Sequence, residues 1–348
     1  MDSGAVARRR RWRPVAVTLG LTGLVGTLVL TGARVLEPRS YPMALLATVS
    51  PAAVVSGLFT AALLAMASLV RGRGRLPAAA SALLALALVA VHVGWLAPSF
   101  VGATPPAGPG RGLTVLSQNF EYGDVADLVA TTRAVRADIV VLVDVQPDQF
   151  DRLLASGFLS AYPYRSGVDS TSPSNTIVLS RFRYTEQRTI AAGHDSRLYR
   201  LEGTPVGTLA FAAVHPPPPY VDGSQPWRDQ LRTIGDALGA QLRSEPSVPV
   251  LAAGDFNADV EHQPFRRLLG VGALRDAAEL ANTGWAPTFP ANDHWTSHGV
   301  APPAFTAIDH VLLGPTLTVT GVRRTDISGS DHLGLVVHVA LRAGAPTG

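Results

Sequence analysis

Three long stretches without a charged side chain lie in the first 110 residues, and they limit what this part of the chain can fold into. They cover residues 14–33, 40–70 and 76–110. A helix needs about 20 mostly apolar residues to cross a bilayer, and three consecutive charge-free runs are unusual in the core of a soluble protein. The sequence therefore predicts three transmembrane helices, within Pro14–Gly32, Tyr41–Val70 and Pro77–Leu96.

The first run also admits a second interpretation, because four arginines before an apolar segment are typical of a cleaved signal peptide. The two further apolar runs favour an uncleaved span. We expect Pro51 to kink the second helix and Trp95 to lie at the membrane interface. His92, inside the third span, is expected to serve in helix packing or at the interface.

The arginines around these runs predict an orientation. Five precede the first span, two lie in the first loop and three in the second: Arg8 to Arg11 and Arg13, Arg34 and Arg39, and Arg71, Arg73 and Arg75. Arginine-rich segments stay on the cytoplasmic side. The predicted order is in, out, in, out, which places the rest of the chain outside the cytoplasm at the cell membrane.

The charge balance changes where the apolar runs end. Residues 1–100 carry ten arginines against two acids, a net of +8, and residues 101–348 carry 19 arginines against 24 acids, a net of −5. A domain with excess negative charge is not typical of a non-specific nucleic-acid binder. The chain has neither cysteine nor lysine, which excludes disulfides, thiol nucleophiles, Cys-ligated zinc and Schiff-base chemistry.

Beyond residue 112 the pattern becomes that of a mixed α+β domain. Helical spacing occurs at 125–137 and 227–243, and short apolar runs typical of strands occur at 113–117, 139–143, 175–180, 208–214, 248–252, 308–313 and 335–341. Strands that alternate irregularly with helices predict a layered α+β sandwich. The expected organisation is a membrane anchor (1–97), a Pro/Gly linker (98–112), a catalytic domain (113–342) and a tail (343–348).

Polar side chains follow or precede several of these predicted strands. They occur in the segments 117–119, 143–146, 254–259, 308–310 and 330–332, and at His215. Each alone has a structural explanation, such as a helix cap at Asn119 or Asp144. Together they predict a site, because strand ends of a sandwich gather at one rim.

This ordered set resembles the endonuclease/exonuclease/phosphatase superfamily, which includes DNase I-like nucleases and inositol phosphatases. The most specific pieces are Gly254–Asp259, Ile308–His310 and Ser330–His332, in that order. The resemblance covers about residues 111–342. It implies a four-layer α/β/β/α sandwich of the DNase I-like type, following the three transmembrane helices, and a phosphatase or phosphodiesterase activity.

The resemblance also implies a role for each matching residue. His332 corresponds to the general base, Asp309 to the carboxylate that orients it, and Asp255 to a residue that orients the attacking water. The remaining matches are metal-binding Asp144, Asn119 and Asp331, phosphate-contacting His215 and Asn257, and a substrate-side Asn175. Asp144 departs from the usual glutamate, so its carboxylate falls short by roughly 1.5 Å, about one C–C bond.

These residue types suit phosphoryl chemistry. A phosphate ester is anionic, and a divalent cation offsets its charge and polarises the phosphoryl oxygen. Carboxylate and amide oxygens are the ligands that Mg²⁺ prefers, and Mn²⁺ takes the same ligands. A histidine with a pKa near 6.5 can accept a proton from water at neutral pH.

The sequence thus predicts a membrane-anchored, extracytoplasmic, Mg²⁺- or Mn²⁺-dependent hydrolase of phosphoester or phosphoanhydride bonds. Treated as a flexible chain, the linker reaches about 20–25 Å, so a lipid-linked (polyprenyl) pyrophosphate is a reasonable substrate and the bilayer a partner. The arrangement is similar to membrane phosphatases of the superfamily that act on such lipids. The alternatives are a surface nuclease or phosphodiesterase, which the charge of −5 disfavours, and a non-catalytic binding protein on the same fold, which Asp144 favours. No protein partner is inferred.

Overall fold

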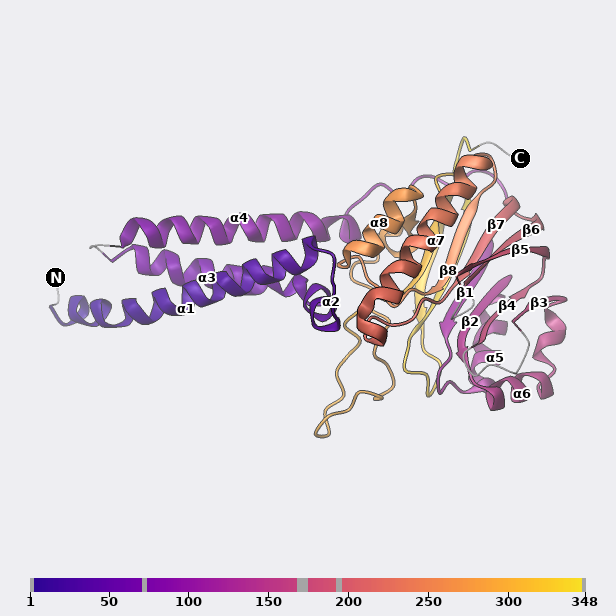
Figure 1. The fold of residues 1–348 in the computed structure, drawn as a ribbon, viewed down its shortest axis with the longest axis horizontal. Helices are drawn as coiled ribbons and strands as arrows, with labels where there is room; N and C mark the ends of the chain where they lie inside the picture. The colour runs from indigo at the N-terminus through magenta and orange to yellow at the C-terminus, as the bar shows by residue number, and fades with distance from the viewer. Residues whose placement is uncertain (1–2, 71–73, 168–174, 192–195, 346–348) are drawn as a thin grey trace. The chain divides into compact units, whose positions relative to one another are not determined.

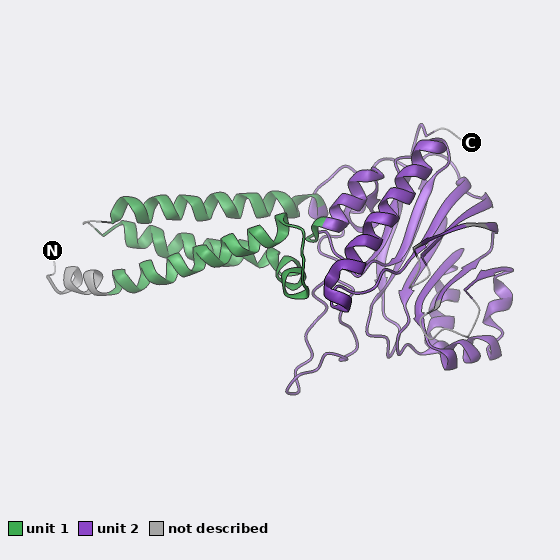
Figure 2. Cartoon of the chain, in the orientation of Figure 1, with its two compact units in different colours: residues 1–98, 261–263 green, residues 99–260, 264–348 purple. Residues whose placement is uncertain are grey.

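The computed structural model describes residues 3–70, 74–167, 175–191 and 196–345. The chain divides into two compact units (Figure 2). A helical unit comprises residues 1–98 together with 261–263, and an α+β unit comprises residues 99–260 and 264–348.

The helical unit contains four α-helices in its described part. They are α1 (Ser3–Val35), α2 (Tyr41–Thr48), α3 (Ala53–Ser68) and α4 (Arg75–Phe100). Among the described residues, three helices are long and apolar enough to cross a membrane: Trp12–Val35, Ser50–Ser68 and Arg75–Phe100. The second predicted helix is broken into α2 and α3 by a short 3-10 turn, Ser50–Ala52. Pro51 lies in this turn, where its missing N–H cannot continue the helical hydrogen bonds.

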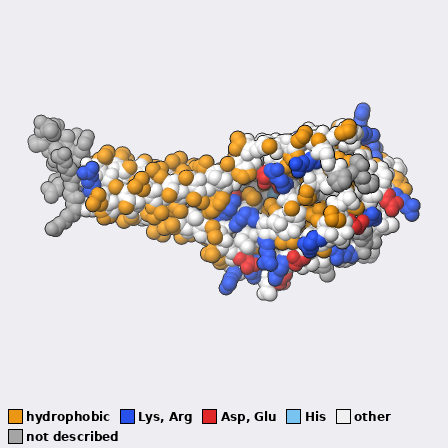
Figure 3. All heavy atoms as spheres, turned by 90° about the horizontal axis from the view of Figure 1, so that it is seen from above, with side chains coloured by type: hydrophobic (Ala, Val, Ile, Leu, Met, Phe, Trp, Pro, Cys, Tyr) orange, Lys and Arg blue, Asp and Glu red, His pale blue; other side chains and the backbone are white. Residues whose placement is uncertain are grey.

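Hydrophobic side chains cover much of the outside of the helical unit (Figure 3). Val25, Phe59 and Leu83 are all more than half exposed. The contacts between helices use small residues instead: a Cβ added at Gly57 would lie 2.6 Å from Val89, and one at Gly23 would lie 2.2 Å from the Thr60 hydroxyl. Close packing through small residues beneath an apolar exterior is typical of helices that pack together within a bilayer.

The α+β unit is built on two six-stranded sheets. The first has the order β11-β12-β1-β2-β4-β3 and the second the order β5-β6-β7-β8-β10-β9. The strands of the first are β1 (Leu113–Asn119), β2 (Ile139–Val145), β3 (Tyr164–Ser166), β4 (Asn175–Ser180), β11 (Leu317–Thr325) and β12 (Gly334–Leu341). Those of the second are β5 (Arg183–Ala191), β6 (Ser196–Thr204), β7 (Gly207–Val214), β8 (Val250–Asp255), β9 (Arg275–Asp276) and β10 (Asp309–Leu313).

Helices cover the outer face of each sheet (Figure 1). Helices α5 (Val125–Val135) and α6 (Pro147–Ala155) cover the first sheet, while α7 (Gln225–Ser244) and α8 (Gln263–Val271) cover the second. Successive side chains of a strand point to opposite faces. Val115 therefore joins the core between the sheets, whereas Leu116 joins the core beneath α5 and α6. This confirms the predicted four-layer α/β/β/α sandwich.

All seven predicted strands are present among the described residues, and the strands β3, β5, β6, β9 and β11 were not expected from the sequence. Polar residues interrupt the apolar pattern of β5, β6 and β11, and β3 and β9 are three and two residues long. All of these except β6 form edges of the two sheets. An edge strand needs less apolar sequence than the buried strands β2 and β8 at the centre.

Part of the predicted linker is bound to the α+β unit. The Gly108 N–H donates to the Leu341 carbonyl at 2.8 Å, and the Thr104 hydroxyl donates to the Leu280 carbonyl at 2.6 Å. The Thr318 hydroxyl donates to the Pro105 carbonyl at 2.6 Å. Because its carbonyls and amides have partners, this part of the segment is not the free tether that a reach of 20–25 Å assumes.

Candidate active site

The topology of the two sheets brings the polar strand ends together. Strands β1 and β2 are parallel with Asn119 opposite Val143, so Asn119 and Asp144 leave the first sheet side by side. Strands β7 and β8 are parallel with Val214 opposite Gly254, so His215 and Asp255 leave the second sheet side by side. The antiparallel β10 begins at Asp309, directly opposite Asp255. Inward packing of the two sheets then collects these ends at one rim.

The backbone before Asp255 requires glycine. Gly254 has a φ of 147°, and a Cβ there would lie 1.9 Å from the Val214 carbonyl oxygen. Two of the predicted site residues, Asp144 (φ 56°) and Asn257 (φ 49°), also have left-handed conformations. Aspartate and asparagine tolerate this region better than other side chains, so the local sequence suits the irregularity within β2 at Asp144 and the turn that follows β8 at Asn257.

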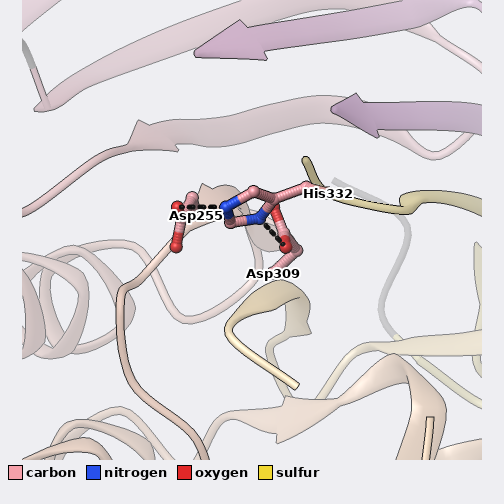
Figure 4. A group of neighbouring side chains, drawn as sticks. All are labelled: Asp255, Asp309 and His332. Carbon is pink, nitrogen blue, oxygen red and sulfur yellow. Dashed lines mark hydrogen bonds and ion pairs between the residues drawn. The ribbon is translucent and has the colours of Figure 1, made fainter. Parts of the chain in front are cut away.

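His332 is held between two buried carboxylates (Figure 4). Its Nδ1 lies 2.8 Å from Asp309 Oδ2 and its Nε2 lies 3.9 Å from Asp255 Oδ2. All three side chains are almost completely buried. The Asp309 carboxylate therefore fixes the ring orientation and leaves Nε2 facing Asp255, as expected for a general base and its orienting acid.

The charges of Asp255, Asp309 and His332 shift the pKa values within this trio. Burial opposes a charged imidazole, but the carboxylates of Asp309, Asp255 and Asp331 outweigh it and raise the pKa of His332 to about 10. Burial and the negative charge of Asp309 raise the pKa of Asp255 to about 7. The cluster as it stands thus holds a proton tightly, and a nearby cation would weaken that hold.

An amide and a second histidine link the two sheets. Asn119 Nδ2 donates to Asp144 Oδ2 at 3.0 Å and to Asp255 Oδ2 at 3.1 Å. His215 Nε2 lies 3.3 Å from Asp144 Oδ2. Asn257 donates its backbone N–H to Asp255 Oδ1 at 2.7 Å and its side-chain amide to the Pro216 carbonyl at 3.0 Å. The structure therefore brings together Asn119, Asp144, His215, Asp255, Asn257, Asp309 and His332.

A further carboxylate, Glu121, lies beside this network and was missed in the sequence. Burial, then the charges of Asp331 and Asp144, raise the pKa of Glu121. Burial is also the largest cause that raises the pKa of Asp331. The only signal in the sequence for a role of Glu121 was its position two residues after Asn119, the last residue of β1. These three side chains form what we call the acidic group: Glu121, Asp144 and Asp331.

The acidic group has the donor set of a hard-cation site. The Asp331 side chain is 9% exposed, and its buried Oδ1 has no hydrogen-bond partner among the described residues. Buried carboxylates without compensating charge are costly, and oxygen ligands suit Mg²⁺ or Mn²⁺. Among the described residues, the group whose ligand atoms all lie within 4.8 Å of one another is a different one, Asp255, Asp309 and His332. In that trio, however, His332 Nδ1 already engages Asp309 Oδ2, although Asp309 Oδ1 is buried without a hydrogen-bond partner among the described residues.

Asn175 and His310 are not part of the network described above. Asn175 begins β4 opposite Val145, next to Asp144, but its side chain lies outside the described residues. His310, from the same Ile308–His310 segment, has a structural role: its Nδ1 contacts the Asp276 carboxylate and its Nε2 lies 2.8 Å from the Ala258 carbonyl oxygen. These contacts tie β10 to β9 and to the turn that follows Asp255.

Comparison with known proteins gives a match to one family and to several solved structures. The sequence model of the Endonuclease/Exonuclease/phosphatase family matches residues 115–332. The chain is similar to D. rerio TDP2 complexed with a single-strand DNA product (18% identity, 66% of this chain and 98% of that chain, TM-score 0.52). It is also similar to C. elegans TDP2 (18% identity, 66% and 75%, TM-score 0.50).

A mannosyl-6-phosphatase of Bacteroides thetaiotaomicron matches at 15% identity, with 66% of this chain and 100% of that chain covered and a TM-score of 0.48. A comparison with curated protein sequences gives no match. At these identities, the likeness to solved structures concerns the fold.

Proposed function

Because the chain belongs to the endonuclease/exonuclease/phosphatase family, whose members hydrolyse phosphoester bonds, we propose that it is a divalent-metal-dependent phosphohydrolase. The observation that carries this proposal is the buried trio in which Asp309 orients His332 towards Asp255. A non-catalytic binding protein would have no need to bury such a costly group of charges.

In this proposal His332 removes the proton from the attacking water. Asp309 accepts the hydrogen bond from Nδ1 and so keeps Nε2 free for that proton. Asp255 lies close enough to Nε2 for one water to contact both, and the Asn257 backbone amide fixes the Asp255 carboxylate. His215 and Asn257 contact the phosphoryl group, where their donors stabilise developing negative charge.

The acidic group is proposed to hold the metal, with Asn119 orienting Asp144. A divalent cation there would offset the phosphate charge and polarise the phosphoryl oxygen. It would also offset the carboxylates that keep His332 protonated, which lowers the pKa of the imidazole towards neutrality. Glu121 is one methylene longer than aspartate, and we propose that its carboxylate compensates for the shorter Asp144.

We further propose that the enzyme is anchored in the cell membrane by the apolar helices, with its catalytic unit outside the cytoplasm. Support comes from three helices of sufficient length and from their exposed apolar side chains. An enzyme held at a bilayer meets substrates that reside in it, so a lipid-linked (polyprenyl) pyrophosphate is the proposed substrate.

A substrate panel tests the proposed activity. We expect the purified full-length protein, with Mg²⁺ or Mn²⁺, to release phosphate from a polyprenyl pyrophosphate and to leave plasmid DNA intact. Chelation of the metal should abolish the release. Nicking of DNA without lipid turnover would instead assign the site to a nuclease, and inactivity on every phosphorylated substrate would favour the binding protein.

The orientation has its own test. A phosphatase reporter that is active only outside the cytoplasm, fused to the C-terminal residue, should be active in cells. The matched fusion to the loop between α3 and α4, which carries Arg71, Arg73 and Arg75, should be inactive because that loop is predicted to be cytoplasmic. The reverse pattern would invert the proposed orientation.

A further inference from the structure

A long loop lies against the catalytic histidine and is fixed on both sides of it. We call residues 284–306 the rim loop. The Ala291 N–H donates to the Asp331 carbonyl at 2.7 Å, and the Leu333 N–H donates to the Thr288 carbonyl at 2.8 Å. The two arms are paired as well, since the Phe305 N–H donates to the Phe289 carbonyl at 2.9 Å. The rim loop is therefore a fixed wall next to His332.

Aromatic rings lead from His332 to the surface along this wall. The Phe289 ring centroid lies 4.7 Å from that of His332, and the Trp295 centroid lies 5.1 Å from that of Phe289. Trp295 is 47% exposed. Nearby, Tyr122 stacks on His294 at 4.6 Å, which places a second exposed ring beside the acidic group that contains Glu121.

The rim loop also borders an open, largely apolar hollow. It has a volume of about 320 Å³ and is lined by residues 290–293 of one arm, residues 301–304 of the other, and Leu333. Proline, alanine and leucine form most of this lining, and the other two lining residues are Asn292 and Asp293. Leu333 directly follows His332 in the chain, and Pro290 directly follows Phe289, whose ring packs on His332. The volume of the hollow is at the lower end of the range for ligand sites.

The charge of the rim loop disfavours one class of occupant, although Arg324 of β11 donates to its Pro287 carbonyl at 2.8 Å. Asp293 is the only charged residue of the loop itself, which has neither arginine nor lysine. A single-stranded nucleic acid needs cations along its backbone in addition to stacked rings. An uncharged apolar chain needs neither, and it gains by leaving water for surfaces such as the hollow and Trp295.

We propose that the rim loop binds the apolar chain of the substrate where that chain joins the scissile phosphate, with Trp295 and the hollow determining specificity for long-chain lipids. This rests on the proposed function. The phosphate lies at His332 and the acidic group, while the first isoprenoid units lie along Phe289 and Trp295 and in the hollow. Trp295 contacts the apolar chain of the substrate and takes no part in the hydrolysis step.

The test compares two substrates that share a pyrophosphate and differ in chain length. With a long polyprenyl pyrophosphate, Trp295→Ala should lower kcat/KM about 10-fold, since an aromatic contact with the chain is lost. With isopentenyl pyrophosphate, the same variant should match wild type. Ala301→Asp, which adds a second carboxylate on the arm opposite Asp293, should show the same selectivity.

Two control variants keep an apolar side chain at the tested position, and a third removes an apolar side chain at another position of the rim loop. Trp295→Phe and Ala301→Val should behave as wild type on both substrates. Trp285→Ala removes a comparably exposed tryptophan (55%) of the rim loop, whereas the ring that packs on Phe289 is Trp295, and this variant too should behave as wild type. Equal losses on the two substrates, or equal losses from Trp285→Ala, would overturn the proposal.

A binding readout separates this proposal from the proposed function. Polyprenyl monophosphate should change the tryptophan fluorescence of the wild type but not of Trp295→Phe, whether or not either pyrophosphate is hydrolysed. Turnover of neither substrate would contradict the proposed function alone. A fluorescence change that persists in Trp295→Phe, or a Trp295→Ala variant that loses only DNA nicking, would contradict the rim-loop proposal.

Discussion

Replacing His332 by alanine will lower phosphate release at least 100-fold, the scale of a lost general base. The imidazole is buried, oriented by Asp309 at 2.8 Å and directed at Asp255, whereas the other histidine of the network, His215, faces Asp144. Asp309→Asn should lower turnover by a similar factor, because an amide cannot hold the same tautomer. Initial rates on the full-length protein measure both.

The pH profile identifies how Asp309 acts. Its carboxylate raises the pKa of His332, and the base must be deprotonated to work. Asp309→Asn should therefore move the acidic limb of the rate profile to lower pH while lowering the plateau. His298→Ala, which removes an exposed histidine of the rim loop, is the matched control and should leave both unchanged. A His332→Ala variant with normal turnover would show that the base lies elsewhere.

Removing two carboxylates of the acidic group will weaken metal binding more than 100-fold. Each charged oxygen ligand contributes to the affinity of a hard-cation site, and we expect about 10-fold from Glu121→Gln or Asp144→Asn alone, a loss of the size seen for partners that support a metal site. Titration with Mn²⁺, followed by electron paramagnetic resonance, measures affinity without any turnover. Glu202→Gln, on the exposed part of β6, is the control for loss of one glutamate.

A compensation experiment tests the role of Glu121 directly. If Glu121 makes up for the short Asp144, then Asp144→Glu should restore most of the Mn²⁺ affinity lost in Glu121→Gln. An unaffected Glu121→Gln single variant would remove Glu121 from the metal site and leave Asp144 and Asp331. A single variant that loses affinity and a double variant that does not recover it would contradict the compensation.

The central strands and their polar ends could be predicted because both signals are local. The strand β2 begins with the apolar, mostly β-branched run 139–143 that leads directly to Asp144, and β8 ends in the Gly254–Asp259 segment. The ordered motifs then placed His215, Asp309 and His332 near one another. The structure adds the distances, which no sequence pattern contains.

Other features depend on contacts that sequence does not encode locally. Glu121 has no motif of its own, and its importance comes from Asp331, which is 210 positions away in the chain. The rim loop has no helical or strand periodicity, so nothing in it indicated that Phe289 would pack against His332. The exposed edge strands β5 and β11 depend on pairing with a neighbour more than on their own composition.

The attachment of residues 104–108 to the α+β unit determines where a soluble fragment of this protein can begin. The Ala343 N–H donates to the Pro106 carbonyl at 2.8 Å, in addition to the bonds from Gly108 to Leu341 and from Thr318 to Pro105. A chain shortened to Leu113 would leave these groups at the edge of β11 and β12 without partners. A chain that begins at Ser99 keeps these hydrogen bonds, because the truncation then lies at the boundary between the two units and not within the hydrogen-bonded segment 104–108.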